Sequence, residues 1–169
     1  MKTFNISIFT ENTVGILNRI TIIFTRRHLN IDSITASECE VENVYRYTIV
    51  LKTTLEKVEK VVGQIEKQVD VIKAFYHSDD EVVSMEMALY KLRADSLDYE
   101  RLTDTVHEKG ARIISLSKDF VTVEKTGTPN EIRKLFKILK PFGVLEYARS
   151  GRVAITKPMK TLEEYLVEN

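Results

Sequence analysis

The sequence predicts an α+β fold built from two βαββαβ units in tandem, each an antiparallel sheet with two helices on one face. The main observation is that the spacing of apolar residues changes between a period of two and a helical period, in the same order, twice along the chain. The 169 residues leave about 80 for each unit, the size of a small domain. Apolar residues make up 43% of the chain and charged residues 30%, as in ordinary globular proteins. We therefore expect one domain at 1–77, a second at 82–157 and a C-terminal tail at 158–169.

The first unit begins with a strand at 4–8, where Phe4, Ile6 and Ile8 alternate with polar residues. A helix is expected over 14–29, because apolar residues recur there at helical spacing and the segment ends in basic residues, which suit a helix C-terminus. The apolar residues of this helix are Ile16, Leu17, Ile20, Ile23 and Phe24.

A hairpin, a second helix and a fourth strand complete the first unit, at 30–38, 45–51, 55–69 and 71–76. In the hairpin, Tyr45 and Tyr47 alternate with polar residues, as in a half-buried strand. Thr53, with Glu56 three residues later, predicts a capping box at the start of the second helix. Its buried face is expected to carry Leu55, Val58, Val62, Ile65 and Val69.

Residues 77–81 are polar and are expected to form a solvated linker, after which the same order begins again. The next strand is predicted from the alternation of Val83, Met85, Met87 and Leu89. A helix follows between Ser96 and Gly110, with an apolar face of Tyr99, Leu102 and Val106.

The second half of this unit carries the clearest local signal in the chain. After a hairpin with strands at 111–117 and 120–125, Thr128 is a predicted N-cap, Pro129 occupies the first helical position and Glu131 the third. The helix buries Ile132, Leu135, Phe136 and Leu139 and breaks at Pro141 and Gly143. A strand at 144–149 completes the second unit.

Composition and motifs exclude several classes of function. The 25 basic and 25 acidic residues give a net charge of +0, which argues against a nucleic-acid or membrane-surface partner. No apolar stretch approaches the roughly 20 residues of a membrane span, and the N-terminus does not resemble a secretory signal, so we expect a cytoplasmic protein. The glycines form no nucleotide-binding fingerprint. His28, His77 and His107 are isolated, and the acidic run 79–81 lacks the spacing of a calcium loop, so we expect no metal site, cofactor or catalytic residue.

One segment could bind a small anion, namely the turn between the first strand and the first helix. Gly15 at the helix entrance lets backbone amides approach a ligand, and the positive end of the helix dipole favours a carboxylate. The alternative is that Asn12 or Thr13 caps the helix and Gly15 only eases a tight turn. Local chemistry leaves both interpretations open.

The same turn carries a resemblance to a known family. The run from Phe9 to Asn12, the run from Gly15 to Arg19 and its continuation over 22–35 resemble the ACT domain of acetolactate synthase (acetohydroxyacid synthase) small subunits, a domain with a ferredoxin-like fold. Residues 64–71 resemble the end of that domain, and 146–151 resemble a signature near the end of the family's second, ACT-like domain. Val14 departs from the family, which commonly has Pro or Ser before the glycine.

The resemblance implies a non-catalytic regulatory subunit that pairs as a homodimer. Members bind a large catalytic subunit, on which thiamine diphosphate, Mg and FAD are expected, raise its activity and in most cases confer feedback inhibition by valine or another branched-chain amino acid. The effector is expected between the strand–helix turn of one chain and the start of the partner's second strand. By matching position, the implied effector-binding residues are Asn12, Gly15, Ile16, Leu17, Asn18, Asn30 and Ile31.

Two rival functions fit the same predicted architecture. An RNA-recognition domain is also a βαββαβ unit, and it stacks bases on aromatic residues such as Tyr45 and Tyr47. However, no Gly-Phe-x-Phe type sequence surrounds them, and the chain is neutral. The other rival is a small enzyme with an ACT-like fold, which would turn over pyruvate without any other subunit.

Overall fold

The structure is a computed structural model that describes residues 1–95, 97–158 and 161–167. By its internal contacts the chain forms two compact units. Unit 1 consists of residues 1–84 together with the described part of 152–169, and unit 2 consists of residues 85–151. The predicted boundaries at 77, 82 and 157 differ from these, because the chain returns to unit 1 after Gly151 instead of forming a separate tail. Within the described residues, no helix is long and apolar enough to cross a membrane.

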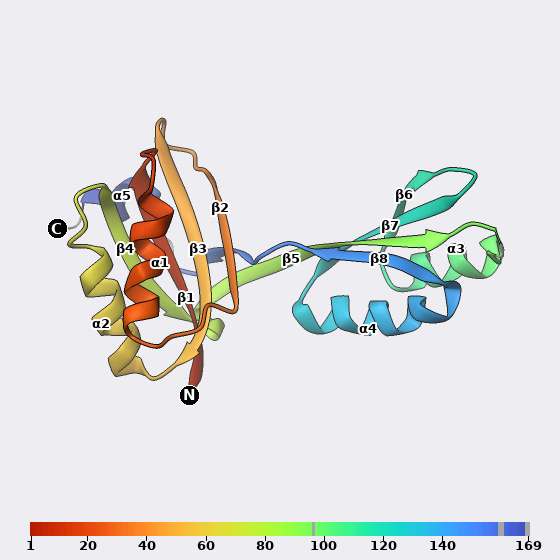
Figure 1. Cartoon of the computed structure of the whole chain (residues 1–169), viewed down its shortest axis with the longest axis horizontal. Helices are drawn as coiled ribbons and strands as arrows, with labels where there is room; N and C mark the ends of the chain where they lie inside the picture. Colours follow the sequence, from red (N-terminus) through yellow and green to blue (C-terminus); the bar gives the residue numbers. More distant parts are fainter. Residues whose placement is uncertain (96, 159–160, 168–169) are drawn as a thin grey trace. The chain divides into compact units, whose positions relative to one another are not determined.

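Unit 1 contains the predicted βαββαβ order, and its antiparallel sheet has the strand order β2-β3-β1-β4. The elements, which can be followed in Figure 1, are β1 Lys2–Glu11, α1 Ile16–Arg26, β2 Ser33–Glu38, β3 Val44–Thr53, α2 Leu55–Ile65 and β4 Val71–Ser78. Alternate strand residues such as Ile6, Ile8 and Ile49 form the core with Ile20, Phe24 and Val58 from the two helices. The amphipathic patterns therefore place both helices on one face of the sheet.

Three predicted details of unit 1 are wrong. Thr53 does not cap α2, because the ladder between β1 and β3 continues to this residue and makes it the buried last residue of β3. The helix begins after Thr54, whose side chain makes no capping hydrogen bond. It ends at Ile65, so Val69 lies beyond it and is exposed, and Leu55, also expected on the buried face, is exposed as well. Leu17, one of the apolar residues of α1 and an implied effector-binding residue, is exposed.

The second face of the unit 1 sheet is covered by the segment after Gly151. Asn5, Ser7 and Phe9 alternate with the core residues of β1, so they point away from the helices, yet all three are buried. The covering segment contains β9, Val153–Thr156, and α5, Leu162–Val167. Arg46 Nη2 donates a hydrogen bond of 2.5 Å to the carbonyl of Ala154, which fixes this segment to β3.

Residues 77–81 are not the solvated linker that the sequence predicts. His77 and Ser78 belong to β4, and Asp79–Glu81 form a short 3-10 helix, η1. Asp79 Oδ1 accepts hydrogen bonds from Asn5 Nδ2 at 2.8 Å and from Arg152 Nη1 at 2.6 Å. Arg152 is itself buried and also donates to Asn5 Oδ1 at 3.0 Å. These three polar side chains therefore join the beginning of β1, η1 and the C-terminal segment.

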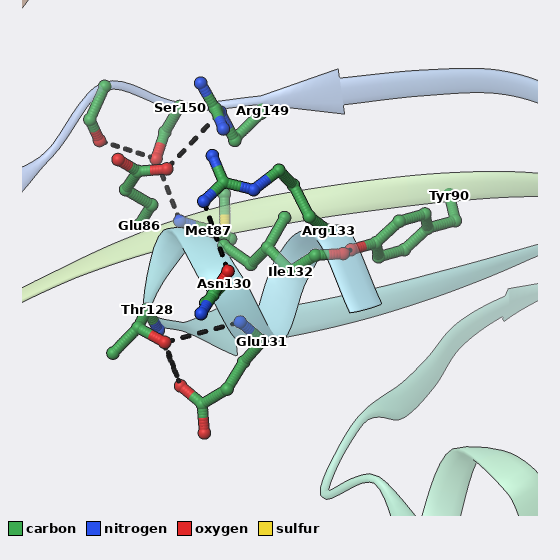
Figure 2. A network of polar contacts seen from close by, with 11 residues as sticks. Glu86, Met87, Tyr90, Thr128, Asn130, Glu131, Ile132, Arg133, Arg149 and Ser150 are labelled. Atoms are coloured by element: carbon green, nitrogen blue, oxygen red, sulfur yellow. Dashed lines mark hydrogen bonds and ion pairs between the residues drawn. The ribbon is translucent and has the colours of Figure 1, made fainter. Parts of the chain in front are cut away.

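Unit 2 repeats the order, with the sheet order β6-β7-β5-β8. Its elements are β5 Val82–Arg93, whose first three residues belong to unit 1, α3 Tyr99–Glu108, β6 Arg112–Leu116, β7 Phe120–Gly127, α4 Pro129–Leu139 and β8 Val144–Arg149. The predicted capping box is confirmed: Thr128 Oγ1 accepts from the Glu131 amide at 3.3 Å, and Glu131 Oε2 accepts from the Thr128 amide at 2.8 Å (Figure 2). Ser96 lies outside the described residues, and Asp98 caps α3 by accepting from the Arg101 amide.

The apolar alternation at the start of β5 does not form the core of unit 2. Val83, Met85 and Met87 are about half exposed, whereas the opposite register, Ala88, Tyr90 and Leu92, is buried against α3 and α4. The Tyr90 hydroxyl donates 2.9 Å to the Ile132 carbonyl in α4, which satisfies the one polar atom of this buried side chain. Tyr99, predicted to face inward from α3, is also exposed.

Candidate functional site

The turn between β1 and α1 has the conformation that an anion site requires. Gly15 is the N-cap of α1 and has a left-handed φ of 86°, which favours glycine. The Thr13 amide donates to the Glu11 carbonyl at 3.0 Å, and the Ile16 amide donates to the Thr13 carbonyl at 3.3 Å. The N-cap is Gly15, which has no side chain, and among the described residues neither the Asn12 nor the Thr13 side chain accepts a hydrogen bond from a backbone amide of α1, so the interpretation in which one of them caps the helix is wrong.

An uncapped helix start leaves backbone amides of the first turn directed out of the helix. A Cβ on Gly15 would meet no heavy atom within 4 Å, so the space beside Gly15 is open. Together with the helix dipole, this arrangement can receive a carboxylate.

The turn is held in place by Arg19 and Asp70. Arg19 Nη2 forms a salt bridge with Asp70 Oδ2 and lies 3.4 Å from Thr13 Oγ1. The Asp70 carbonyl also accepts from the Glu11 amide at 3.0 Å. Sequence reasoning assigned no function to either residue, because a charge pair between residues distant in sequence leaves no local pattern.

The residues predicted to bind the effector do not all lie together in one chain. Asn12, Leu17 and Asn18 are exposed beside Gly15, but the Ile16 side chain is buried in the core and leaves only its backbone at the surface. Asn30 is exposed and Ile31 half-buried, and both precede β2 at the other end of the sheet.

The pairing of the strands shows how far Asn30 and Ile31 lie from Asn12 within one chain. Ser33 pairs with Val50, and Val50 pairs with Asn5, so the beginning of β2 lies level with Asn5. Asn12 is seven residues further along the chain, roughly 24 Å at the rise of a strand. A depression of about 490 Å³ beside the turn includes Asn12, but its wall also carries Glu11 and Glu42, which disfavour a carboxylate.

The unit 1 sheet does not offer the aromatic surface of an RNA-recognition domain. Tyr47 is buried in the core, and Tyr45 packs against the same core, with its hydroxyl donating 3.2 Å to Glu38 Oε1. The opposite face of the sheet is covered by the C-terminal segment. Neither tyrosine can therefore stack a base in this structure.

In the part of the chain that the structure describes, no group of three His, Cys, Asp or Glu residues is arranged so that it could hold a metal ion. His77 is half-buried, with its ring 5.4 Å from that of Phe75, and burial lowers its pKa. It is therefore not the solvated histidine that the sequence suggests.

The signature at 146–151 has a structural role within unit 2 (Figure 2). Ser150 Oγ accepts from the Met87 amide at 2.9 Å and donates to the Gly151 carbonyl at 2.8 Å. Arg149 Nε lies 3.3 Å from the buried Glu86 Oε2. These contacts fix the end of β8 to β5.

Comparison with known proteins covers both units. The family model described as the AHAS small subunit-like ACT domain matches residues 6–73, and the model for the small subunit of acetolactate synthase matches 85–158. The chain is 33% identical to the acetolactate synthase small subunit of Mycolicibacterium smegmatis over 92% of its length and 91% of that protein. It is 35% identical to the Bacillus subtilis small subunit, over 90% of this chain and 89% of that protein. The crystal structure of the Thermotoga maritima small subunit covers 95% of this chain and is itself covered completely, with a TM-score of 0.84 at 28% identity.

Proposed function

Because the chain belongs to the family of acetolactate synthase small subunits, we propose that it is a non-catalytic regulatory subunit. It binds the catalytic large subunit in the cytoplasm, raises its activity and makes it sensitive to valine or another branched-chain amino acid. The main support is that the sequence similarity to this family spans both units, including the turn at Gly15. Thiamine diphosphate, Mg and FAD belong to the large subunit, where the reaction takes place.

The proposed effector site uses the geometry of the turn. The effector carboxylate binds the amides of the first turn of α1, beside Gly15 and Leu17. The amide oxygens of Asn12 and of Asn30 from the partner subunit accept hydrogen bonds from its ammonium group. The uncapped helix start and the salt bridge between Arg19 and Asp70 support this assignment, because they present the amides in a fixed position.

A second copy of the chain would complete the site, and the strand register indicates how. β2 lies at the edge of the unit 1 sheet. Glu38 at its end pairs with Tyr45, which pairs with Thr10, so β2 ends level with the turn. Antiparallel pairing of β2 with the β2 of a second copy reverses the direction of the added strand. The partner's Asn30 and the partner's Ile31 then approach the turn of the first chain, and a homodimer forms one continuous sheet.

The effector side chain would contact Leu17 and the partner's Ile31. An apolar pocket distinguishes one methylene by only about 1 to 3 kcal/mol, so valine, leucine and isoleucine should all bind, with graded affinity. Because the site is shared between chains, the effector changes the free-energy difference between dimer geometries, and about 1 to 3 kcal/mol of coupling is enough for feedback inhibition.

The test is reconstitution with the catalytic large subunit. Acetolactate formation is measured with and without this chain and over a valine titration, and sedimentation gives the oligomeric state. We expect no turnover by this chain alone, higher turnover by the complex, and inhibition by valine. Turnover of pyruvate by the isolated chain would support the small-enzyme alternative instead. A complex no more active than the large subunit alone would refute the regulatory role.

A further inference from the structure

The covered face of the unit 1 sheet is unusually polar for a buried surface. In the described residues, five buried side-chain nitrogen or oxygen atoms have no hydrogen-bond partner. Four of them lie on this face: Ser33 Oγ, Thr35 Oγ1, Arg46 Nε and Arg152 Nε. Ser33 and Thr35 belong to it because they pair with Val50 and Thr48, whose neighbours on β1 are Asn5 and Ser7. Buried polar groups are normally satisfied, so this face has unused capacity to bind a polar group.

A cavity of about 220 Å³ lies on this face, inside unit 1. Its apolar wall is formed by Phe9 and Phe75 from the sheet and by Ile155 and Leu162 from the C-terminal segment. Arg46 and Glu40 supply charged groups. The volume equals about seven water molecules at roughly 30 Å³ each, which suits a small metabolite but not a nucleotide.

Arg46 is the cationic group in this cavity. Its guanidinium carbon lies 5.4 Å from the centre of the Phe9 ring, and Nη2 donates to Ser7 Oγ at 3.3 Å and to the Ala154 carbonyl at 2.5 Å. Both acceptors are neutral, and Nε is buried without an acceptor. Burial lowers the pKa of Arg46, and the charge of Glu40 opposes this shift. A partly desolvated cation with neutral acceptors is most strongly stabilised by an anion in contact with its guanidinium group.

We propose that the cavity beneath the C-terminal segment binds a small organic monocarboxylate with an apolar body, with Arg46 contacting the carboxylate and Phe9, Phe75, Ile155 and Leu162 contacting the apolar part. A monoanion matches the single guanidinium, whereas a phosphate would carry a second charge towards Glu40. The aromatic and aliphatic walls select a ligand with a hydrocarbon body over an inorganic ion. This site shares no residue with the proposed effector site and does not depend on it.

The first test uses isobutyrate as the probe and the full chain carrying Gly15→Asp, which disables the proposed effector site. Binding is followed by calorimetry and by the Nε–Hε signals of the arginines in a ¹H–¹⁵N spectrum. We expect saturable binding of one isobutyrate per chain and a shift of the Arg46 signal. Isobutyramide, which has the same shape without the charge, should bind at least about tenfold more weakly, because a hydrogen bond to a charged group is lost. Chloride should not reproduce the effect, because it has no apolar body.

Matched variants provide the second test. Arg46→Met keeps the length of the side chain, identifies the Arg46 signal by its loss and should abolish isobutyrate binding. Arg133→Met, the same change on α4 of unit 2, should leave binding unchanged. Glu40→Gln should strengthen binding, since it removes a like charge, and this gain cannot arise from unfolding.

Three results would overturn the proposal. These are the absence of saturable isobutyrate binding, equal affinity for isobutyrate and isobutyramide, and unchanged binding in Arg46→Met. Because these measurements need no large subunit and no valine, their failure is distinguishable from failure of the regulatory function.

Discussion

Replacing Gly15 by aspartate should remove valine sensitivity from the reconstituted complex while leaving activation of the large subunit in place. The new carboxylate would lie where the effector carboxylate is proposed to bind, in front of the uncapped start of α1. A Cβ at this position meets no heavy atom within 4 Å, so the side chain fits sterically. The expected effect is therefore electrostatic repulsion between two carboxylates.

The size of this effect follows from Coulomb's law. Two like charges about 4 Å apart repel by about 1 kcal/mol in bulk water and about 4 kcal/mol at the effective dielectric constant near a protein surface. Valine affinity should then fall between about fivefold and about a thousandfold, since each 1.4 kcal/mol is a factor of ten. If the site is enclosed between two chains, the loss of valine affinity should lie near the thousandfold end of this range.

Backbone strain has to be separated from charge. Gly15 has a φ of 86°, and any L-residue there is strained by roughly 1 to 2 kcal/mol, with asparagine and aspartate tolerated best. Gly15→Asn is therefore the matched control, because it has the same shape and strain without the charge. Acetolactate formation is measured for both variants over a valine titration, and thermal unfolding confirms that both are folded. The Asn variant should keep substantially more valine inhibition than the Asp variant. Equal loss in the two would refute the electrostatic argument, and full inhibition of the Asp variant would refute the site.

Three further substitutions test other features of the structure. Asp70→Asn breaks the partly exposed salt bridge with Arg19 and should lower the free energy of unfolding by at most about 1 kcal/mol. Calorimetry should also show weaker valine binding. Unchanged binding would mean that this salt bridge does not position the turn. Thr128→Ala removes the capping box of α4 and should lower the free energy of unfolding by about 0.5 to 2 kcal/mol in denaturant titrations. Hydrogen bonds from Thr128 lower the pKa of Glu131, so their contribution to stability is present above the unfolded-state pKa of Glu131 and is lost as the pH falls through its folded-state pKa. Thr128→Ala should therefore make the free energy of unfolding less sensitive to acid. An unaltered pH profile of stability would contradict this coupling between the capping box and the protonation of Glu131. Tyr90→Phe removes the hydrogen bond from the Tyr90 hydroxyl to the Ile132 carbonyl and should cost about 1 kcal/mol in the same titrations, with no change in activation of the large subunit.

The order of elements could be predicted because it is written in local periodicity, but local signals fail where tertiary pairing competes with them. Thr128 caps α4 as predicted, since Pro129 fixes the backbone at the first helical position. Thr53 presents the same Thr-x-x-Glu pattern, yet it is taken up by the ladder with β1. A strand that pairs through its whole length outweighs a cap, which contributes about 1 kcal/mol.

The orientation of β5 shows a second limit. Alternation gives the period of a strand but not the face that is buried, and β5 has apolar residues on both faces. Tyr90 and Leu92 lie further along the strand, opposite the helices, and they determine which face is buried. Met85 and Met87 are therefore exposed, although their alternation is as regular.

In the candidate site, the turn could be predicted because a glycine before a helix has a local meaning, whereas its surroundings could not. The contact of Arg19 with Asp70 joins residues 51 positions apart, and nothing in either neighbourhood indicates it. The covering of the unit 1 sheet by residues 152–158 and 161–167 was missed for the same reason. A usable signal was present in β1, where Phe9 lies on the face opposite to Ile8, so that both faces needed cover.

The return of the chain to unit 1 at Arg152 means that unit 2 is inserted within unit 1. At a synthesis rate of about 5 to 20 residues per second, the roughly 70 residues of the insertion take about 3 to 14 s to emerge from a ribosome. Throughout this interval Phe9 has no cover, and Asn5 and Asp79 lack the guanidinium that later joins them. The unit whose strands are translated first is consequently completed last, and its sheet face is most open to aggregation or to chaperone binding while the second unit is still being made.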